Sequence, residues 1–161
     1  MQVIEIYVMW CSLLASVNLR AMTTVVTHTI ASGDLRHRYA HRVRELRLKA
    51  GLTQQALGTA VGLHRVYVGR VESGTVNFSL ANLEKLLRVL EPDGNPRPLS
   101  ERLATNLKKH RNAVSQEAFA SKLELPVLLI SRLERQVVAT TIDQVARLAE
   151  KLSIDGEALL K

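Results

Sequence analysis

The sequence repeats one pattern of residues after 62 positions, and this repeat limits the possible folds more than any other feature. The segment LTQQALGTAVGL at 52–63 aligns with VSQEAFASKLEL at 114–125. The aliphatic positions that follow also align: Val68 with Ile130, Val71 with Leu133, Leu80 with Ile142 and Leu83 with Val145. Because there are only two copies and their period exceeds that of most solenoid repeats, the pattern predicts two tandem small domains rather than an extended array.

Prolines and a glycine separate the two copies. The segment EPDGNPRPLS at 91–100 contains three prolines and one glycine, which neither a helix interior nor a central strand accommodates. We therefore predict a first domain at 37–91, a linker at 92–99 and a second domain at 100–161. Residues 1–36 are left as an N-terminal arm, either disordered or an over-extended reading of the start of the protein.

Both copies carry the signals of short helices. Thr53 and Ser115 are residue types that cap helix N-termini, and the apolar positions after them are spaced three and four apart. Gly62 can take the left-handed conformation that ends a helix, and Pro126 suits the first position of a helix in the second copy. The fifth helix of the first copy is lost to the linker or very short. The predicted fold class is all-α, with four to five helices per domain, at 37–50, 53–60, 64–72, 79–90, 100–111, 115–122, 126–134, 141–152 and 155–160.

The charge balance favours an anionic partner. The formal net charge is +7, and residues 36–91 hold ten Lys or Arg against four Asp or Glu, whereas residues 99–161 hold ten against eight. Nucleic acid is the first candidate, although charge by itself does not distinguish it from a membrane surface or an acidic protein. Because the excess lies in the first copy, we expect nucleic-acid binding there.

Other functions lack their sequence signals. The one cysteine, Cys11, cannot form an internal disulfide, which fits a reducing cytoplasm. His37 and His41 stand four apart, but no acidic or Cys ligand lies near them, so a solvated basic face is favoured over a zinc site. The apolar residues 1–21 have no positive n-region and are too short in their uncharged part to span a bilayer. With no phosphate loop or nucleophile motif either, we expect no enzyme activity, metal, cofactor or membrane partner.

With these elements in place, the first copy resembles the Cro and phage-repressor type of helix-turn-helix family. The motif is GLTQQALGTAVGLHRVYVGRVESG, in which Thr53 and Gln54 open the first helix, Gly62 makes the turn, and Glu72 and Gly74 close the second helix. With the tandem pattern, the resemblance covers about 37–91 and 100–161 and implies two lambda-repressor-like domains joined by the Pro/Gly linker.

The resemblance also implies an ion pair in each copy. In this family an arginine on the first helix typically meets the glutamate that closes the recognition helix, which implies a structural pair of Arg47 and Glu72. In the second copy the equivalent would be Lys108 or Lys109 with Glu134. The segment before the second motif is one residue longer than its counterpart, so the choice between the two lysines stays open.

One face of the second helix of the first motif is suited to reading DNA bases. At about 100° per residue, Arg65, Val66, Gly69 and Arg70 share a face, and the opposite face is mainly apolar. The resemblance implies that the polar face enters the major groove, where arginine can donate to both O6 and N7 of guanine and a valine can touch a thymine methyl group. Phosphate contacts are expected around this face, from Thr53, Gln54, His64, Tyr67, Asn77, Arg42 and Arg44.

The second motif has different side chains at the equivalent positions. The two glycines of the motif are replaced, by Glu124 and Gln136. Apolar side chains surround most of its second helix, and such a helix is normally covered by something. We interpret this surface as a protein contact, with a second copy of the chain or another regulator as partner, formed by Val127, Leu128, Ser131 and Arg132.

The sequence therefore predicts a sequence-specific, DNA-binding transcription regulator of the cytoplasm and nucleoid. We expect a repressor that reads double-stranded DNA with the first motif and associates as a homodimer, or with a regulatory protein, through the second. Two alternatives stay open. One is a protein-binding antagonist or antitoxin whose second motif captures an activator or toxin; in the other, both motifs bind DNA as a single-chain pseudo-dimer.

Overall fold

Short helices build the whole of the described chain. The structure, a computed structural model, describes residues 35–161, and residues 1–34 of the expected N-terminal arm lie outside this range. The first part contains a helix over residues 35–49, then α2 (Gln54–Val61), α3 (Arg65–Glu72) and α4 (Leu80–Leu90). The second part contains α5 (Leu99–Arg111), α6 (Gln116–Lys122), α7 (Val127–Glu134), α8 (Ile142–Lys151) and the 3-10 helix η1 (Gly156–Leu159). The all-α prediction is confirmed for these residues.

Two expected boundaries are wrong. The arm was expected to reach residue 36, but residues 35 and 36 are helical, and Leu35 is buried. The linker was expected to include Leu99, but this residue begins α5 and is buried. Both leucines lie next to polar segments in the sequence. They are helical in the structure because their side chains pack into a core to which both parts of the molecule contribute. Residues 91–98 contain no helix, so the first part has no counterpart of η1.

The helix ends follow the sequence signals closely. Thr53 Oγ1 accepts a hydrogen bond from the backbone N–H of Ala56, and Ser115 Oγ accepts the equivalent bond from Ala118. Such caps satisfy backbone N–H groups that have no partner within the helix. Gly62 ends α2 in the left-handed conformation, with φ at +69°.

The second part repeats this backbone without glycine. Glu124, at the position equivalent to Gly62, has φ at +51°, and Gln136, at the position equivalent to Gly74, has φ at +60°. A side chain in this region costs roughly 1–2 kcal/mol per residue relative to right-handed backbone. The turn geometry is therefore kept at those two positions although the residue type best suited to it is absent.

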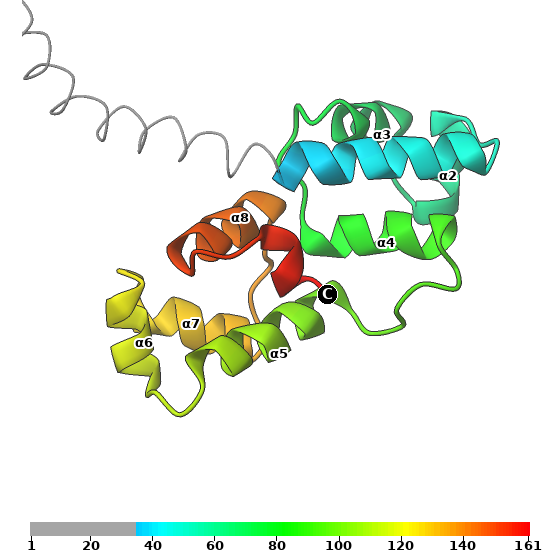
Figure 1. The fold of residues 1–161 in the computed structure, drawn as a ribbon. Helices are drawn as coiled ribbons and strands as arrows, with labels where there is room; N and C mark the ends of the chain where they lie inside the picture. The colour runs from blue at the N-terminus through cyan, green and yellow to red at the C-terminus, as the bar shows by residue number, and fades with distance from the viewer. Residues whose placement is uncertain (1–34) are drawn as a thin grey trace, which may run out of the picture.

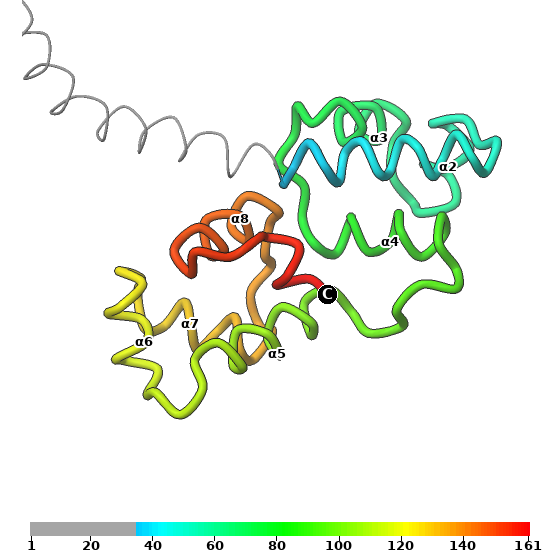
Figure 2. Tube along the Cα trace, viewed as in Figure 1, coloured from blue at the N-terminus to red at the C-terminus, as the bar shows by residue number. Residues whose placement is uncertain are grey.

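One continuous core joins the two parts. The buried residues of α2, α3 and α4 belong to the same hydrophobic cluster as those of α5 to α8 and η1. Figure 1 and Figure 2 show α8 beside the start of α4, with α4 and α8 running away from this meeting point in opposite directions. Leu35 packs against Gly156 of η1, so the first helix is held by the last one. Among residues 35–161, no helix is both long and apolar enough to cross a membrane.

Candidate nucleic-acid interface

Helix α3 presents a polar face to solvent and an apolar face to the core. Val68 and Val71 are completely buried, whereas Arg65 and Arg70 are exposed and Val66 retains 50% of its accessible surface. His64 caps the helix, because its Nδ1 accepts a hydrogen bond from the backbone N–H of Val66 at 3.2 Å. The helix therefore begins next to the exposed pair Arg65 and Val66, where backbone N–H groups and side chains face outward together.

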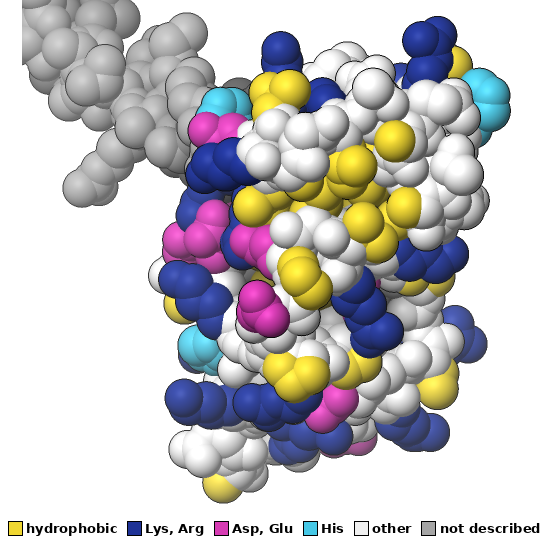
Figure 3. All heavy atoms as spheres, turned by 90° about the vertical axis from the view of Figure 1, so that its right-hand side faces the viewer, with side chains coloured by type: hydrophobic (Ala, Val, Ile, Leu, Met, Phe, Trp, Pro, Cys, Tyr) yellow, Lys and Arg dark blue, Asp and Glu magenta, His cyan; other side chains and the backbone are white. Residues whose placement is uncertain are grey.

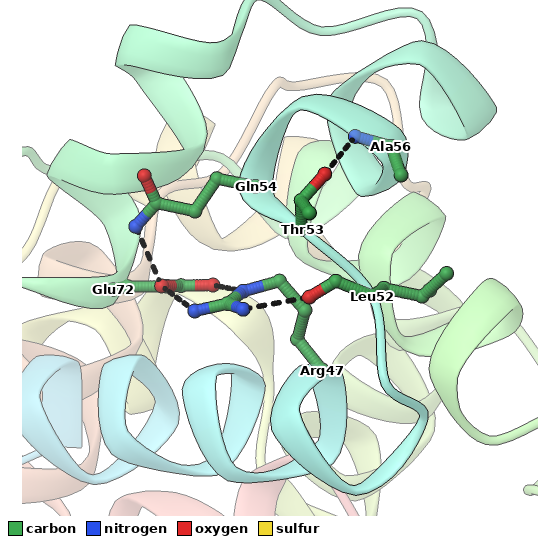
Figure 4. A network of polar contacts seen from close by, with 6 residues as sticks. All are labelled: Arg47, Leu52, Thr53, Gln54, Ala56 and Glu72. Carbon is green, nitrogen blue, oxygen red and sulfur yellow. Dashed lines mark hydrogen bonds and ion pairs between the residues drawn. The ribbon is translucent and has the colours of Figure 1, made fainter.

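A buried ion pair holds α3 against the first helix (Figure 4). Arg47 Nε donates to Glu72 Oε1 at 2.5 Å, and Arg47 Nη2 donates to Glu72 Oε2 at 2.8 Å. Arg47 Nη1 also donates to the carbonyl oxygen of Leu52 at 2.8 Å, and Gln54 Nε2 donates to Glu72 Oε2 at 2.9 Å. This is the pair that the family resemblance implies, and the third partner, Gln54, ties it to the start of α2.

Burial and hydrogen bonding act on the Glu72 carboxyl in opposite directions. Burial alone raises the pKa of Glu72, whereas the hydrogen bonds from Arg47 and Gln54 and the nearby positive charge of Arg44 lower it, and the net pKa lies below the usual value. Glu72 is therefore ionised at neutral pH. Its role is structural, because its carboxylate accepts hydrogen bonds from Arg47 and Gln54 of the same domain.

Two residues of the expected DNA-contacting face lie partly inside the molecule. Gly69 is half-buried beneath the side chain of Gln54, whose Oε1 would stand 3.3 Å from a Cβ atom at this position. Gly69 therefore makes room for the Gln54 amide, and that amide is held by Glu72. Tyr67 is half-buried as well, and its hydroxyl accepts a hydrogen bond from Asn82 of α4 at 3.0 Å. A phosphate contact from Tyr67 stays a prediction, and it would have to use the O–H donor while the oxygen accepts from Asn82.

Two other expected phosphate ligands are engaged elsewhere. Arg42 Nη2 donates to both carboxylate oxygens of Glu91, at 2.9 and 2.8 Å. Asn77 Nδ2 donates to Thr141 Oγ1 at 3.2 Å, so this amide belongs to the junction with the second part. Sequence spacing missed both because each partner comes from a distant segment. Both residues are nevertheless exposed, as are Thr53, His64 and Arg44, whereas Gln54 is half-buried and donates to Glu72.

Helix α7 exposes apolar side chains at the positions that carry Arg65 and Val66 in α3. Val127 keeps 38% and Leu128 keeps 59% of its accessible surface, and Arg132 is exposed. Ser131, which was expected to contact a partner, is buried, and its Oγ accepts a hydrogen bond from Arg135 Nη2 at 2.7 Å. That expectation is wrong, because a side chain as small as serine at the position equivalent to Gly69 is covered by its neighbours.

The second part holds its helix with a different cation from the expected one. Arg111 Nε donates to Glu134 Oε1 at 2.7 Å, and Gln116 Nε2 donates to Glu134 Oε2 at 2.6 Å. Lys108 and Lys109 are exposed, so the expectation that one of them pairs with Glu134 is wrong. Arg111 stands closer to the motif than Arg47 does in the first part, and its Nη1 donates to the carbonyl oxygen of Val114. Arg111 lies four positions before the cap residue Ser115, whereas Arg47 lies six positions before Thr53, so the expected longer segment is in fact shorter in the second part.

Positive side chains are present beyond the first part. Figure 3 shows the end of the molecule where α2 and the end of α4 lie, with hydrophobic side chains in its upper part and Lys and Arg along its lower edge. In Figure 1 the lower part of the molecule consists of α5, α6 and α7. No group of three or more His, Cys, Asp or Glu with metal-binding geometry occurs among residues 35–161, and His37 instead packs against Gly74.

Helix α3 has a polar exposed face, the Arg47–Glu72 ion pair holds it in place, and the capped helix α2 precedes it. This arrangement is that of a helix-turn-helix module. A helix-turn-helix family model matches residues 43–91 of the chain. The chain is 37% identical over 60 residues to the control protein C.BamHI of Bacillus amyloliquefaciens, a match that covers 37% of this chain and 74% of that protein. The chain belongs to this helix-turn-helix family.

Two further relatives match over similar lengths. The control protein C.MunI of a Mycoplasma species is 35% identical over 54 residues, which cover 33% of this chain and 73% of that protein. A Neisseria hypothetical transcription factor, from Neisseria meningitidis serogroup B, is 39% identical over 57 residues, which cover 35% of this chain and 54% of that protein. No solved structure gives a significant match. Residues 99–161 lie outside the range that the family model matches.

Proposed function

We propose that this protein is a sequence-specific, DNA-binding transcription regulator that reads bases with the exposed face of α3. The observation that carries the proposal is the exposure of Arg65, Val66 and Arg70 on a helix whose other face is buried. Two guanidinium groups beside one apolar side chain suit a half-site with guanine and thymine, because arginine bonds guanine O6 and N7 and valine contacts the thymine methyl group. Membership of the helix-turn-helix family and the relatives named as control proteins and as a transcription factor support this reading.

The proposal includes a cytoplasmic, nucleoid-associated location and the direction of regulation. Repression is the simplest outcome, because a protein that occupies an operator excludes other proteins from the same DNA without any further contact. A reporter gene placed behind the selected operator tests the direction: repression predicts higher expression when the regulator is absent. Lower expression in its absence would show activation.

The proposal also includes a tandem arrangement, in which residues 99–161 form a second, degenerate helix-turn-helix domain. Three features support it: α5 to α8 follow the order of the first four helices, the left-handed turns recur at Glu124 and Gln136, and Glu134 repeats the contacts of Glu72. These features concern the backbone, the turns and the internal packing. They therefore support a second domain that shares the fold of the first part but differs from it in its surface residues.

The decisive experiment is selection of bound duplexes from a random DNA pool, followed by binding measurements on the enriched sequence. Arg65→Ala and Arg70→Ala should each weaken specific binding by about 5- to 150-fold, the factor that corresponds to roughly 1–3 kcal/mol for a bidentate contact. Arg88→Ala is the matched control, because Arg88 is an exposed arginine on α4 that pairs with Glu84. Binding of both α3 variants at the wild-type level would refute the assignment.

Protein association through α7 is a second candidate function, and the exposed apolar side chains of Val127 and Leu128 favour it. A homodimer through this surface, or capture of an activator or toxin, would remove those side chains from water. Sedimentation of the chain without DNA tests the homodimer. A dimer that Leu128→Glu dissociates would support it, and a wild-type monomer at micromolar concentration would count against it.

A further inference from the structure

The junction between the two parts of the chain is made by equivalent residues. An antiparallel bridge joins Ser79 to Thr141, two residues that are 62 positions apart in the repeat. The backbone N–H of Leu80 donates to the carbonyl oxygen of Thr140 at 2.8 Å, and the N–H of Ile142 donates to the carbonyl oxygen of Phe78 at 3.0 Å. Leu80 and Ile142 are equivalent in the repeat, and so are Phe78 and Thr140, so replacing each residue of one bond by its equivalent gives the other bond. Because this bridge pairs residues that are equivalent in the repeat, it relates the two parts by a local pseudo-two-fold axis, as in the isologous contacts of symmetric homodimers.

The same junction fixes the two parts relative to each other. Phe78, Leu80, Thr140 and Ile142 are all buried there. Away from the axis, Arg38 Nη1 donates to Asp155 Oδ1 at 2.8 Å, and Asp155 has a pKa below its usual value chiefly because of this hydrogen bond. In Figure 1, α3 and α7 lie on opposite sides of the junction. Two recognition-type helices are thus held at one separation by one chain, an arrangement that symmetric DNA-binding proteins reach with two chains.

The exposed surface of α7 fits DNA better than it fits a second copy of the chain. Two partly exposed side chains, Val127 and Leu128, are far from the ~800 Å² per partner that a stable protein interface buries. The exposed cations of this region, Lys122 at the end of α6, Arg132 on α7 and Arg135 just after it, would repel their own copies in a symmetric contact, whereas phosphate would neutralise them. Aliphatic side chains contact thymine methyl groups, and Arg132 occupies the position of Arg70.

We propose that one chain binds one asymmetric DNA site, with α3 on a guanine-containing half-site and α7 on a half-site recognised by its thymine methyl groups. The site is pseudo-palindromic in spacing, with its halves about one helical turn or a multiple apart, but not in sequence. The proposal rests on the DNA-binding function proposed above, and it assigns to α7 a ligand of its own. Because α3 and α7 carry different side chains at equivalent positions, one chain can bind an operator whose two half-sites differ in sequence.

The test uses the full chain and the duplex selected by it. The mass of the complex, measured by light scattering, should correspond to one chain per duplex. Replacing thymine by uracil in the second half-site removes only methyl groups and should weaken binding by about fourfold for each contacted methyl, the factor of one buried methyl group. Leu128→Ala should bind more weakly and should no longer respond to uracil. Val89→Ala, another exposed aliphatic residue, on α4, should keep the full response.

The outcomes separate this inference from the DNA-binding function itself. One chain per duplex with a response to uracil that Leu128→Ala abolishes supports the proposal. Two chains per duplex, reduced to one by Leu128→Glu, overturns it in favour of a homodimer through α7. A selected sequence with a single half-site and no response to uracil overturns it while leaving the function of α3 intact. Absence of any selected sequence overturns both.

Discussion

Removing Arg47 should expose the consequence of an unpaired buried carboxylate. In Arg47→Met the side chain keeps most of its apolar stem, so packing changes little, but both guanidinium bonds to Glu72 are lost. Only Gln54 then donates to the carboxylate. The Glu72 side chain keeps 3% of its accessible surface, so water cannot replace the missing donors.

The size of the effect follows from the protonation of Glu72. The folded variant avoids a buried, unpaired anion by holding Glu72 protonated, which raises its folded pKa above the unfolded value of about 4.3. The resulting loss of stability is about 3.7 kcal/mol at pH 7 and about 1 kcal/mol at pH 5, at roughly 1.4 kcal/mol per pH unit. This agrees with the roughly 3–5 kcal/mol typical when one partner of a buried ion pair is removed.

The pH dependence has a definite sign. In the wild-type protein the pKa of Glu72 is lowered, so its contribution is present at and above pH 5 and is lost only as the pH falls through the folded pKa. In Arg47→Met the folded state binds more protons than the unfolded state, so its stability falls as the pH rises from 5 to 7. The difference between the two proteins should therefore grow over this interval.

Urea denaturation of both proteins at pH 5, 6 and 7 measures this difference. Arg42→Met is the matched control, because Arg42 also pairs with a carboxylate, but at the surface, where the side chains of Arg42 and Glu91 keep 49% and 29% of their accessible surface. It should cost about 0–1 kcal/mol with no such slope. If Arg47→Met behaves like this control, or if its deficit does not change between pH 5 and 7, the reasoning about a buried unpaired carboxylate is refuted.

Three further predictions concern the turns, the junction and the charges. Gly74→Ala should lower the free energy of unfolding by more than about 1 kcal/mol, because a methyl group there overlaps the His37 ring and φ is +67°. The reverse change at the equivalent position, Gln136→Gly, should raise the free energy of unfolding by about 1 kcal/mol. Urea denaturation measures both. Ile142→Ala should cost about 2–5 kcal/mol and destabilise both parts together, which hydrogen exchange of 35–90 and 99–161 would show as one common loss of protection; loss in one part alone would contradict a shared core. Arg44→Ala should reduce the slope of log binding constant against log salt by about 1, whereas an unchanged slope would exclude a phosphate contact there.

Much of the local structure could be predicted from the sequence. The helices lie within about two residues of their expected positions, as is usual for such boundaries, because capping residues and three–four spacing act within one or two turns. The exposure of Arg65, Val66 and Arg70 was also predictable, since a short amphipathic helix with valines on one face can bury only that face. The exposure of Val127 and Leu128 follows from the repeat, which places them at the positions of Arg65 and Val66.

Contacts between distant segments could not be predicted in the same way. The partner of Glu134 is Arg111 rather than a lysine, because the path of the chain between α5 and α6 decides which cation reaches the carboxylate. Asn77 bonds to Thr141, and Tyr67 bonds to Asn82, although Asn77 and Tyr67 are residue types that commonly bind phosphate. Each of these pairings depends on how two helices meet, and periodicity within one helix carries no information about its neighbour.

The sequence by itself determined that this protein is made of short helices in two similar sets, that the first set belongs to the helix-turn-helix type, and which side of α3 remains in water. These properties depend on interactions between residues a few positions apart. Only the tertiary structure decided that the two sets of helices share one core and meet at a bridge between Ser79 and Thr141. The physical reason is that Ser79 and Thr141 are brought together by the burial of Phe78, Leu80 and Ile142, which no local pattern specifies.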